Sequence, residues 1–174
     1  MKSLSFILLT ALPFSAPSLL RGDTSQAQSS GADNRAVSPA YVHVHDSDKA
    51  MEQAVHQAQR SLSKFMAALT SPKPGQTGFA VKRRCIEGDK CEHIWLADLH
   101  FDGRLLRGKV YNNPVDVKSL RLGQKVTVRP EEISDWMYVE NGRLVGGYTV
   151  RAYYHTLPAA EKRQFAENVG FRLE

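Results

Sequence analysis

Long hydrophobic stretches are scarce in this chain of 174 residues, and cysteine occurs only twice. The apolar run from Leu4 to Leu12 is too short to span a bilayer comfortably, and no later segment is long enough. We therefore predict no integral membrane segment after an N-terminal signal is removed. Two cysteines alone also fall short of the ligand set of a structural metal site.

The motifs of common catalytic and cofactor-binding folds are missing as well. The sequence contains no G-x-S-x-G elbow, P-loop, H-E-x-x-H or glycine-rich dinucleotide fingerprint, and no internal repeat. The formal net charge of +5 is spread along the chain, and the run Lys82-Arg83-Arg84 is interpreted as a solvated strand edge. We predict no catalytic residues, metal, cofactor or nucleic-acid partner.

The N-terminus has the pattern of a secretory signal peptide. Lys2 gives the positive start, the apolar run follows, and Ser25-Gln26-Ala27 is a small-x-small cleavage site. We predict a signal peptide at 1–27, a flexible leader at 28–46 and one domain at 47–174. The predicted location is therefore periplasmic or secreted, and the alternative is an apolar tail that stays attached.

The two cysteines, Cys85 and Cys91, flank a turn centred on Gly88. With a three-residue loop they face each other across a hairpin, where a disulfide suits an oxidising compartment. A metal pair and a redox pair are the alternatives, but neither the further ligands nor a C-x-x-C spacing is present. We expect a structural disulfide.

The spacing of apolar residues predicts an α+β fold. From Ser47 to Leu69 they recur at steps of three and four, which indicates one amphipathic helix of about six turns. We expect an antiparallel sheet of about five or six strands, with this long N-terminal helix packed on one face and a short C-terminal helix beginning at Pro158. Residues 149–154 fit either a helix or a last strand.

The clearest local signal is the hairpin around Asn141-Gly142, because a type I′ turn needs two residues that tolerate positive φ. Three cross-strand pairs agree with one register. They are Glu140 with Arg143, Val139 with Leu144 and Tyr138 with Val145.

Five residues are candidates for a partner-binding surface, namely His93, Trp95, Asp135, Trp136 and Arg151. If their strands neighbour each other, the two indoles form aromatic anchors and Arg151 a charged partner. In the alternative interpretation the indoles belong to the core, and Asp135 accepts hydrogen bonds from nearby backbone.

A cell-envelope hydrolase is the second hypothesis. It uses His93 or His100 with Asp135 or Asp98, and requires these side chains to converge in a cleft. Asp98, His100 and Asp102 stand at i, i+2 and i+4, so they share a strand face and suit metal binding or acid–base chemistry. The simpler interpretation is a solvent-facing strand end, with Asp102 beginning a turn.

Several short motifs follow one another along the chain: EHIWL at 92–96, Gly108, Asn113-Pro114, ISDWM at 133–137 and GGYTVR at 146–151. This combination resembles the YegJ-like domain family, over roughly residues 47–170. The resemblance implies a bacterial source and an α+β fold, but the family is of unknown function and carries over no catalytic residues. In general appearance the family also resembles small immunity-type domains, which neutralise toxins.

One hypothesis for the whole chain agrees with four observations. They are its small size, the export pattern, the hairpin with its predicted disulfide, and the absence of a recognisable set of catalytic residues. We expect an exported bacterial module that binds a protein partner without catalysis. An immunity or inhibitor role, with a toxin or an envelope enzyme as the partner, is the sharpest form of this hypothesis.

Overall fold

The computed structural model describes residues 3–7, 41–45 and 49–173. Within the predicted signal peptide and leader, it describes only the strands β1 (Ser3–Ile7) and β2 (Tyr41–His45). The predicted cleavage site after Ala27 lies outside the described residues.

The described part of the domain combines four helices with an antiparallel sheet. Its helices are α1 (Lys49–Arg60), α2 (Leu62–Thr70), α3 (Tyr148–Thr156) and α4 (Ala159–Asn168), with a 3-10 turn η1 (Pro130–Glu132). Its strands are β3 (Gln76–Glu87), β4 (Lys90–Phe101), β5 (Leu106–Val110), β6 (Lys125–Val128), β7 (Ile133–Glu140) and β8 (Arg143–Gly146). The predicted α+β class is confirmed, and residues 149–154 are helical.

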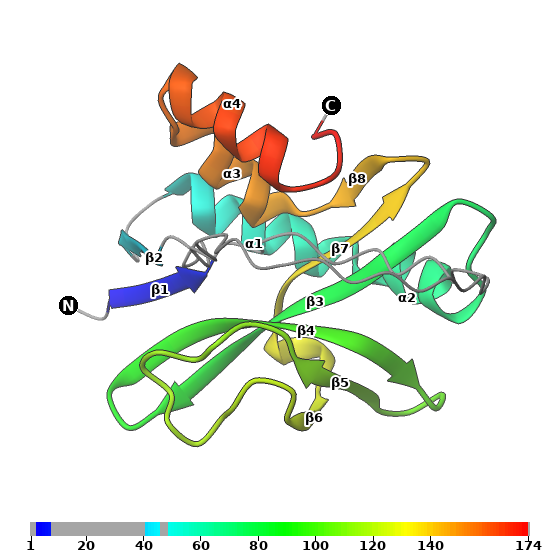
Figure 1. Cartoon of the computed structure of the whole chain (residues 1–174). Coiled ribbons are helices and arrows are strands. Elements are labelled where there is room, and N and C mark those ends of the chain that lie inside the picture. Colours follow the sequence, from blue (N-terminus) through cyan, green and yellow to red (C-terminus); the bar gives the residue numbers. More distant parts are fainter. Residues whose placement is uncertain (1–2, 8–40, 46–48, 174) are drawn as a thin grey trace, which may run out of the picture.

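Strands β3 to β8 pair antiparallel in the order β6-β5-β4-β3-β7-β8. Strand β1 lies parallel to β4 beside Cys91–His93, and β2 pairs antiparallel with β1. The long hairpin of β3 and β4, twelve residues each, forms the middle of the molecule. Helices α3 and α4 lie toward one end of it and β5 and β6 toward the other (Figure 1).

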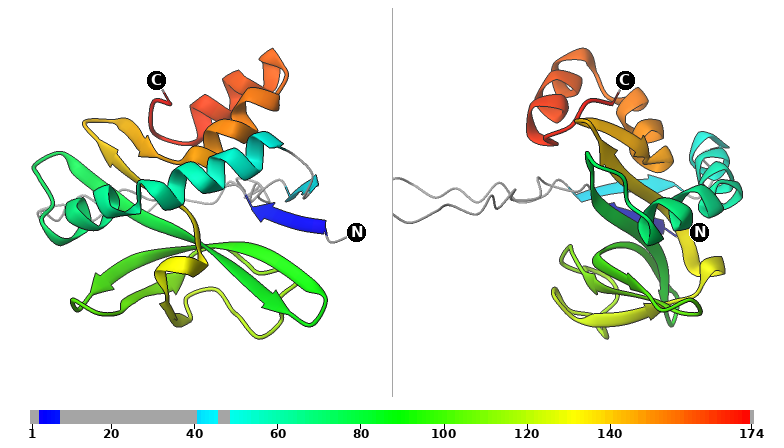
Figure 2. Two further views of the ribbon diagram at one scale, coloured as in Figure 1. Left: turned by 180° about the vertical axis from the view of Figure 1, so that it is seen from behind. Right: turned by 90° about the vertical axis from the view of Figure 1, so that its right-hand side faces the viewer.

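The predicted long N-terminal helix is divided in two at Ser61. The Ser61 hydroxyl donates to the Gln57 carbonyl oxygen at 2.6 Å and lies 2.9 Å from the Tyr148 hydroxyl. Such a bond back to the preceding turn competes with the helical backbone and bends helices. Helices α1 and α2 therefore follow the sheet as two short segments (Figure 2).

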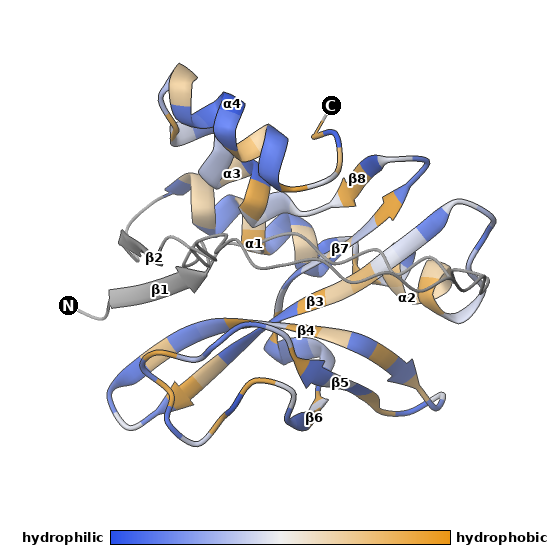
Figure 3. Ribbon diagram, viewed as in Figure 1, coloured by the Kyte–Doolittle hydropathy of each residue, from blue (hydrophilic) through white to orange (hydrophobic). Residues whose placement is uncertain are grey.

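Both faces of the central sheet are buried, because successive strand residues point to opposite faces and each face has its own helices. One cluster includes Val81, Ile94, Leu96 and Trp136 with Ala58 and Phe65 of α1 and α2. The other includes Ala80, Trp95 and Met137 with Val150 of α3 and Phe165 of α4. The N-terminal helices thus pack on one face, as predicted, and the C-terminal helices cover the other. Figure 3 shows hydrophobic residues along the strands of the central sheet, with hydrophilic residues between them toward the strand ends.

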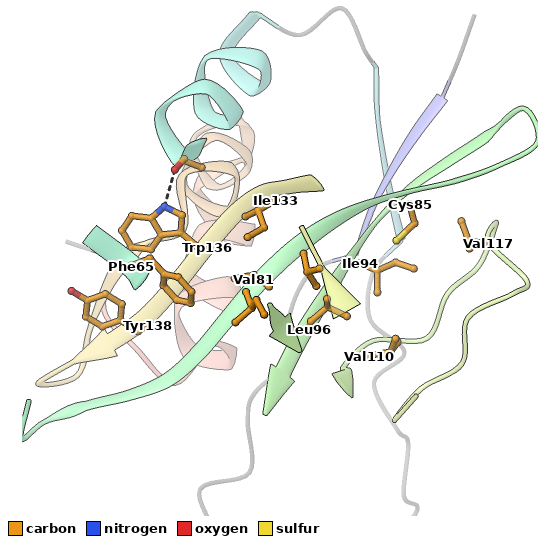
Figure 4. Close-up of a cluster of buried hydrophobic side chains, with 13 residues drawn as sticks. Phe65, Val81, Cys85, Ile94, Leu96, Val110, Val117, Ile133, Trp136 and Tyr138 are labelled. Carbon is orange, nitrogen blue, oxygen red and sulfur yellow. Dashed lines mark hydrogen bonds between the residues drawn. The ribbon is translucent and has the colours of Figure 1, made fainter. Parts of the chain in front are cut away.

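Trp136 joins β7 to the N-terminal helices. Its indole nitrogen donates to the Ala58 carbonyl oxygen at 2.8 Å, and its ring centroid lies 5.4 Å from that of Phe65. Figure 4 shows Trp136, Phe65 and Tyr138 at one end of this cluster and Val110 and Val117 at the other. The side chain is fully buried, which is the core interpretation of this residue.

The predicted hairpin at Asn141-Gly142 is confirmed with its register, since Glu140 pairs with Arg143, Val139 with Leu144 and Tyr138 with Val145. Asn141 and Gly142 have φ angles of 50° and 76°, as a type I′ turn requires. At the end of β8, Gly146 has a φ of 72°, and a Cβ there would lie 2.3 Å from the Trp136 carbonyl oxygen. The chain enters α3 directly after this close approach, where the Gly147 N–H donates to the same Trp136 oxygen at 2.8 Å.

The predicted register of the β3–β4 turn was wrong by one residue. The loop has two residues, Gly88 and Asp89, so Cys85 pairs with Glu92 and Ile86 pairs with Cys91. A shift of one residue moves a side chain to the other face of the sheet, so the two cysteines do not face each other. Both are buried free thiols, and the predicted disulfide is absent from the structure.

Candidate functional site

Four of the five predicted partner-binding residues are internal. His93, Trp95, Asp135 and Trp136 are each at most 3% exposed. Trp95 and Trp136 also belong to clusters on opposite faces of the sheet. They therefore cannot form one surface with aromatic anchors, and the structure favours the core interpretation of both indoles.

Asp135 on β7 caps the beginning of α3. Its Oδ1 accepts from the backbone N–H groups of Trp136 at 2.8 Å and Tyr148 at 3.1 Å. Its Oδ2 accepts from the Thr149 N–H at 2.8 Å and from the Thr149 hydroxyl at 2.5 Å. A carboxylate at a helix N-terminus satisfies otherwise unpaired N–H groups and is favoured by the helix dipole. The backbone-acceptor interpretation of Asp135 is thus confirmed.

Lys82 on β3 lies fully inside the same polar cluster. Its Nζ donates to the Thr149 hydroxyl oxygen at 2.6 Å and lies 4.7 Å from the centre of the Trp95 ring. Burial lowers the pKa of Lys82 to about 8, and the Asp135 charge opposes this shift. Burial likewise raises the pKa of Asp135. Thr149 therefore links an ammonium and a carboxylate that compensate each other within the protein.

His93 contacts the hydroxyl of Ser134 on β7, with 2.6 Å between its Nδ1 and the Ser134 Oγ. Burial, followed by the charges of Lys82 and Arg84, lowers the pKa of His93 to about 3, so the imidazole is neutral near pH 7. Serine and histidine are the residue types of a nucleophile and its base. Both are only 3% exposed, however, so a substrate has no access to this hydroxyl in the structure.

Arg151 of α3 binds backbone rather than offering a charge to a ligand. Its Nε donates to the Gly146 carbonyl oxygen at 3.1 Å, and its Nη2 donates to that of Leu144 at 2.7 Å. Its Nη1 donates to the carbonyl oxygen of Leu173. The guanidinium therefore ties α3 to β8 and to the C-terminal segment.

Asp98 and His100 line a separate exposed hollow of about 250 Å³ with residues of β5 and β6. Asp98 lies in a bulge of β4 with a φ of 49°, and its carboxylate is 2.8 Å from Lys109 Nζ. Asp102 begins a turn, where it accepts from the N–H groups of Arg104 and Leu105. The predicted row of three is therefore not formed, and the simpler interpretation holds for Asp102.

The two halves of the predicted hydrolase site do not meet. His93 and Asp135 lie in the buried cluster, whereas His100 and Asp98 lie on the exposed hollow beside β5 and β6. No three His, Cys, Asp or Glu side chains of the described part of the chain gather as a metal site would require. None of the described helices is long and apolar enough to cross a membrane.

A groove that sequence reasoning missed runs beside the end of β3. We call it the β3 groove; its volume is about 400 Å³, and it is lined by Arg83, Arg84, Cys85, Ile86, Val117, Ser119, Leu120, Arg129, Glu131 and Glu132. The basic run at 82–84 was its only sequence signal. Of that run only Arg84 is exposed, since Lys82 is buried and Arg83 pairs with Glu132 at 3.1 Å.

The wall of the β3 groove opposite β3 is fixed by two carboxylates. Glu92, which is fully buried, accepts from the backbone N–H groups of Val115, Asp116 and Val117 at 2.9 to 3.1 Å. Glu87 accepts from the N–H and hydroxyl of Ser119. The loop therefore has a defined position against the β3–β4 hairpin.

A sheet covered on both faces, with its ionisable residues compensated inside, defines an α+β domain built around a buried polar cluster. The chain belongs to a family described as uncharacterized proteins conserved in bacteria, DUF2314, which matches residues 48–173. This confirms the family resemblance that the motifs indicate.

Two relatives illustrate the range of the family. The chain is 32% identical to the uncharacterized protein YegJ of Escherichia coli K12 over 113 residues, which are 65% of this chain and 72% of that protein. It is 36% identical over 78 residues to a Neisseria meningitidis serogroup B protein provisionally named an ankyrin repeat protein, covering 45% of this chain and 31% of the relative. No solved structure matches the chain.

Proposed function

We propose that this protein is an exported bacterial module that binds another protein without catalysing a reaction. The observation that carries the proposal is the contrast between the buried polar cluster and the β3 groove. The ionisable groups of the buried polar cluster are engaged inside the protein, whereas the groove presents Ile86, 63% exposed, beside the exposed Arg84. Ile86 and the partly buried Leu120 both line this groove among charged residues, and apolar patches rimmed by polar residues mark interaction sites.

The name of one relative also supports a protein-binding function. Ankyrin repeats form extended surfaces that bind other molecules, and a protein provisionally named after them contains a region similar to this chain. Export to the periplasm or beyond rests on the N-terminal sequence pattern. By analogy with small exported immunity-type domains, we propose a toxin or an envelope enzyme as the partner, with inhibition or immunity as the outcome of binding.

The hydrolase hypothesis has less support. Its histidines and aspartates lie in two separate places, and the buried pair of Ser134 and His93 is closed to substrate. A hydrolase needs nucleophile, base and a substrate position within reach of each other.

Affinity capture with matched variants tests the proposal. The purified chain is incubated with envelope and secreted extracts, in parallel with Ile86→Asp in the β3 groove and Arg104→Glu in the exposed β4–β5 turn. We expect one stoichiometric partner, identified by mass spectrometry, that the wild type and Arg104→Glu retain and Ile86→Asp loses. Circular dichroism melts confirm that the variants are folded.

Two outcomes contradict this function. One is the absence of any partner above background, and the other is turnover of an envelope substrate that survives purification and disappears in a folded His93→Gln or His100→Gln variant. Export is tested separately, because N-terminal sequencing of the protein recovered from the periplasm or medium should begin at Gln28.

A further inference from the structure

Strand β3 extends beyond its partner β7. Its pairing with β4 continues to Glu87 and Lys90, whereas its pairing with β7 ends at Arg83 and Ile133. In an antiparallel hairpin alternate residues turn their N–H and C=O groups to the partner strand. The two-residue turn makes Glu87 and Cys85 the residues bonded to β4, so Arg84 and Ile86 point theirs the other way. Within the described residues no strand pairs with them there.

This unpaired segment, Arg84–Ile86, is called the β3 edge below, and the β3 groove lies along it. Beyond Ile133 the chain leaves the line of β7 through η1, and the residues of 129–132 then form the far wall with those of 117–120. The volume of about 400 Å³ falls within the range of ordinary binding pockets. Because Glu92 and Glu87 hold the loop wall, the groove is present before any partner arrives.

The side chains of the β3 edge indicate which residues an added strand would need. Arg84 and Ile86 are two residues apart and share a face, so an added strand meets a cation at one position and an apolar side chain at another. Arg84 forms no salt bridge within the described part of the chain, whereas Arg83 and Arg129 both pair with Glu132. Three arginines face the groove against two glutamates.

We propose that the β3 edge accepts an extended segment of a partner protein as an additional strand, and that this segment carries acidic side chains. Strand addition uses main-chain hydrogen bonds for affinity and alternate side-chain contacts for specificity. A charged residue on a strand edge discourages pairing with an identical copy, which favours an acidic partner over a second copy of this chain. The inference rests on the proposed function and adds the surface and the partner's chemistry.

Peptide binding to the isotope-labelled full chain tests the proposal. The probe is a blocked heptapeptide, Thr-Glu-Thr-Val-Thr-Glu-Thr, which places acidic and apolar side chains two residues apart on one face, and its binding is followed by nuclear magnetic resonance and amide hydrogen exchange. We expect saturable shifts at the β3 edge and slower exchange of the Arg84 and Ile86 amides. Counterparts with alternate amides N-methylated keep every side chain but cannot pair along the edge, and should bind at least about tenfold more weakly.

Two variants of the protein distinguish the contribution of the Arg84 charge from a general effect of adding a negative charge to the surface. Arg84→Glu should weaken the peptide about tenfold or more, whereas Arg104→Glu at the exposed turn should leave affinity unchanged. Equal binding of the N-methylated peptides, shifts away from the β3 edge, or no binding at millimolar peptide would overturn the proposal. So would protection of the edge amides in a concentration-dependent dimer without peptide. If a captured partner leaves these amides exchanging freely, the binding function stands and strand addition fails.

Discussion

The hydroxyl of Thr149 on α3 donates to Asp135 Oδ2 on β7 at 2.5 Å, while its oxygen accepts from Lys82 Nζ on β3 at 2.6 Å. One side chain thus joins a helix N-terminus to two strands and bridges two opposite charges. Because all three groups are buried, each depends on the others for its compensation.

We expect Asp135→Ala to lower the free energy of unfolding by roughly 3–5 kcal/mol, since it removes the carboxylate that compensates the buried Lys82 ammonium. It also removes the acceptor of two N–H groups of α3. Urea denaturation measures the change. Asp89→Ala in the exposed β3–β4 turn is the matched control and should cost little; equal losses in the two variants would contradict the compensating role of Asp135.

His93 should make the protein sensitive to mild acid. The unfolded chain binds a proton at the histidine near its ordinary pKa of 6.5, but burial holds the pKa of His93 in the folded protein at about 3. Between these pH values unfolding takes up a proton, so stability falls as the pH falls, by up to about 1.4 kcal/mol per pH unit. Above pH 6.5 the histidine is neutral in both the folded and the unfolded chain, so the full stability that its burial as a neutral ring permits is present.

The difference between wild type and His93→Gln isolates that effect from the carboxylates. Glutamine can still bond Ser134 but does not titrate. Chemical denaturation at a series of pH values should show a shallower decline for His93→Gln between pH 6.5 and 3. Parallel curves would mean that the pKa of His93 in the folded protein is close to its value in the unfolded chain.

Gly146 and Gly142 form a matched pair, because both have a positive φ and only Gly146 is crowded. Gly142→Ala places its Cβ in open space and should cost only about 1–2 kcal/mol, from the backbone conformation. Gly146→Ala places a Cβ 2.3 Å from the Trp136 carbonyl oxygen and 2.5 Å from its ring, so we expect a much larger loss or no folded protein. Thermal melts of both variants decide whether the approach of Gly146 to Trp136 is required.

Glu92 should control the loop that walls the β3 groove. Glu92→Ala removes the acceptor of three backbone N–H groups, at a cost of about 1–3 kcal/mol for each buried group left unpaired. We expect faster hydrogen exchange at Val115, Asp116 and Val117 in a domain that remains folded. Glu161→Ala on the exposed face of α4 is the control, and unchanged exchange at these three amides would contradict the assignment.

The cysteines should titrate as two free thiols. Protein unfolded in guanidinium without reductant should react with two equivalents of a thiol reagent, whereas the folded protein reacts slowly at pH 8. Burial raises the pKa of the Cys85 thiol to about 11, which leaves little reactive thiolate. A single intact disulfide, detected by mass spectrometry of unreduced peptides, would contradict the register of the β3–β4 hairpin.

The sequence was most informative where structure is local. The register at Asn141-Gly142 follows from turn chemistry alone, and the α+β order follows from periodicity. The loop at Gly88 was ambiguous, because its glycine fits either a two- or a three-residue turn, and that one residue decides where Cys85 points.

The candidate site could not be placed from sequence for a different reason. Its residues are buried by partners far along the chain, since the bond from Lys82 to Thr149 spans 67 residues and that from Val115 to Glu92 spans 23. A histidine or aspartate on a strand shows nothing locally of the helix that later covers it. The β3 groove escaped notice because it arises where β7 stops pairing, which no pattern within β3 records.

The central hairpin of β3 and β4 contributes residues to both hydrophobic clusters, and one of these runs from the N-terminal helices to β5 and β6. The two sides of the sheet therefore have no boundary along which one can melt while the other persists. Unfolding should be a single cooperative event, and a fragment lacking either end of the molecule would lose part of a core that the remaining end also uses.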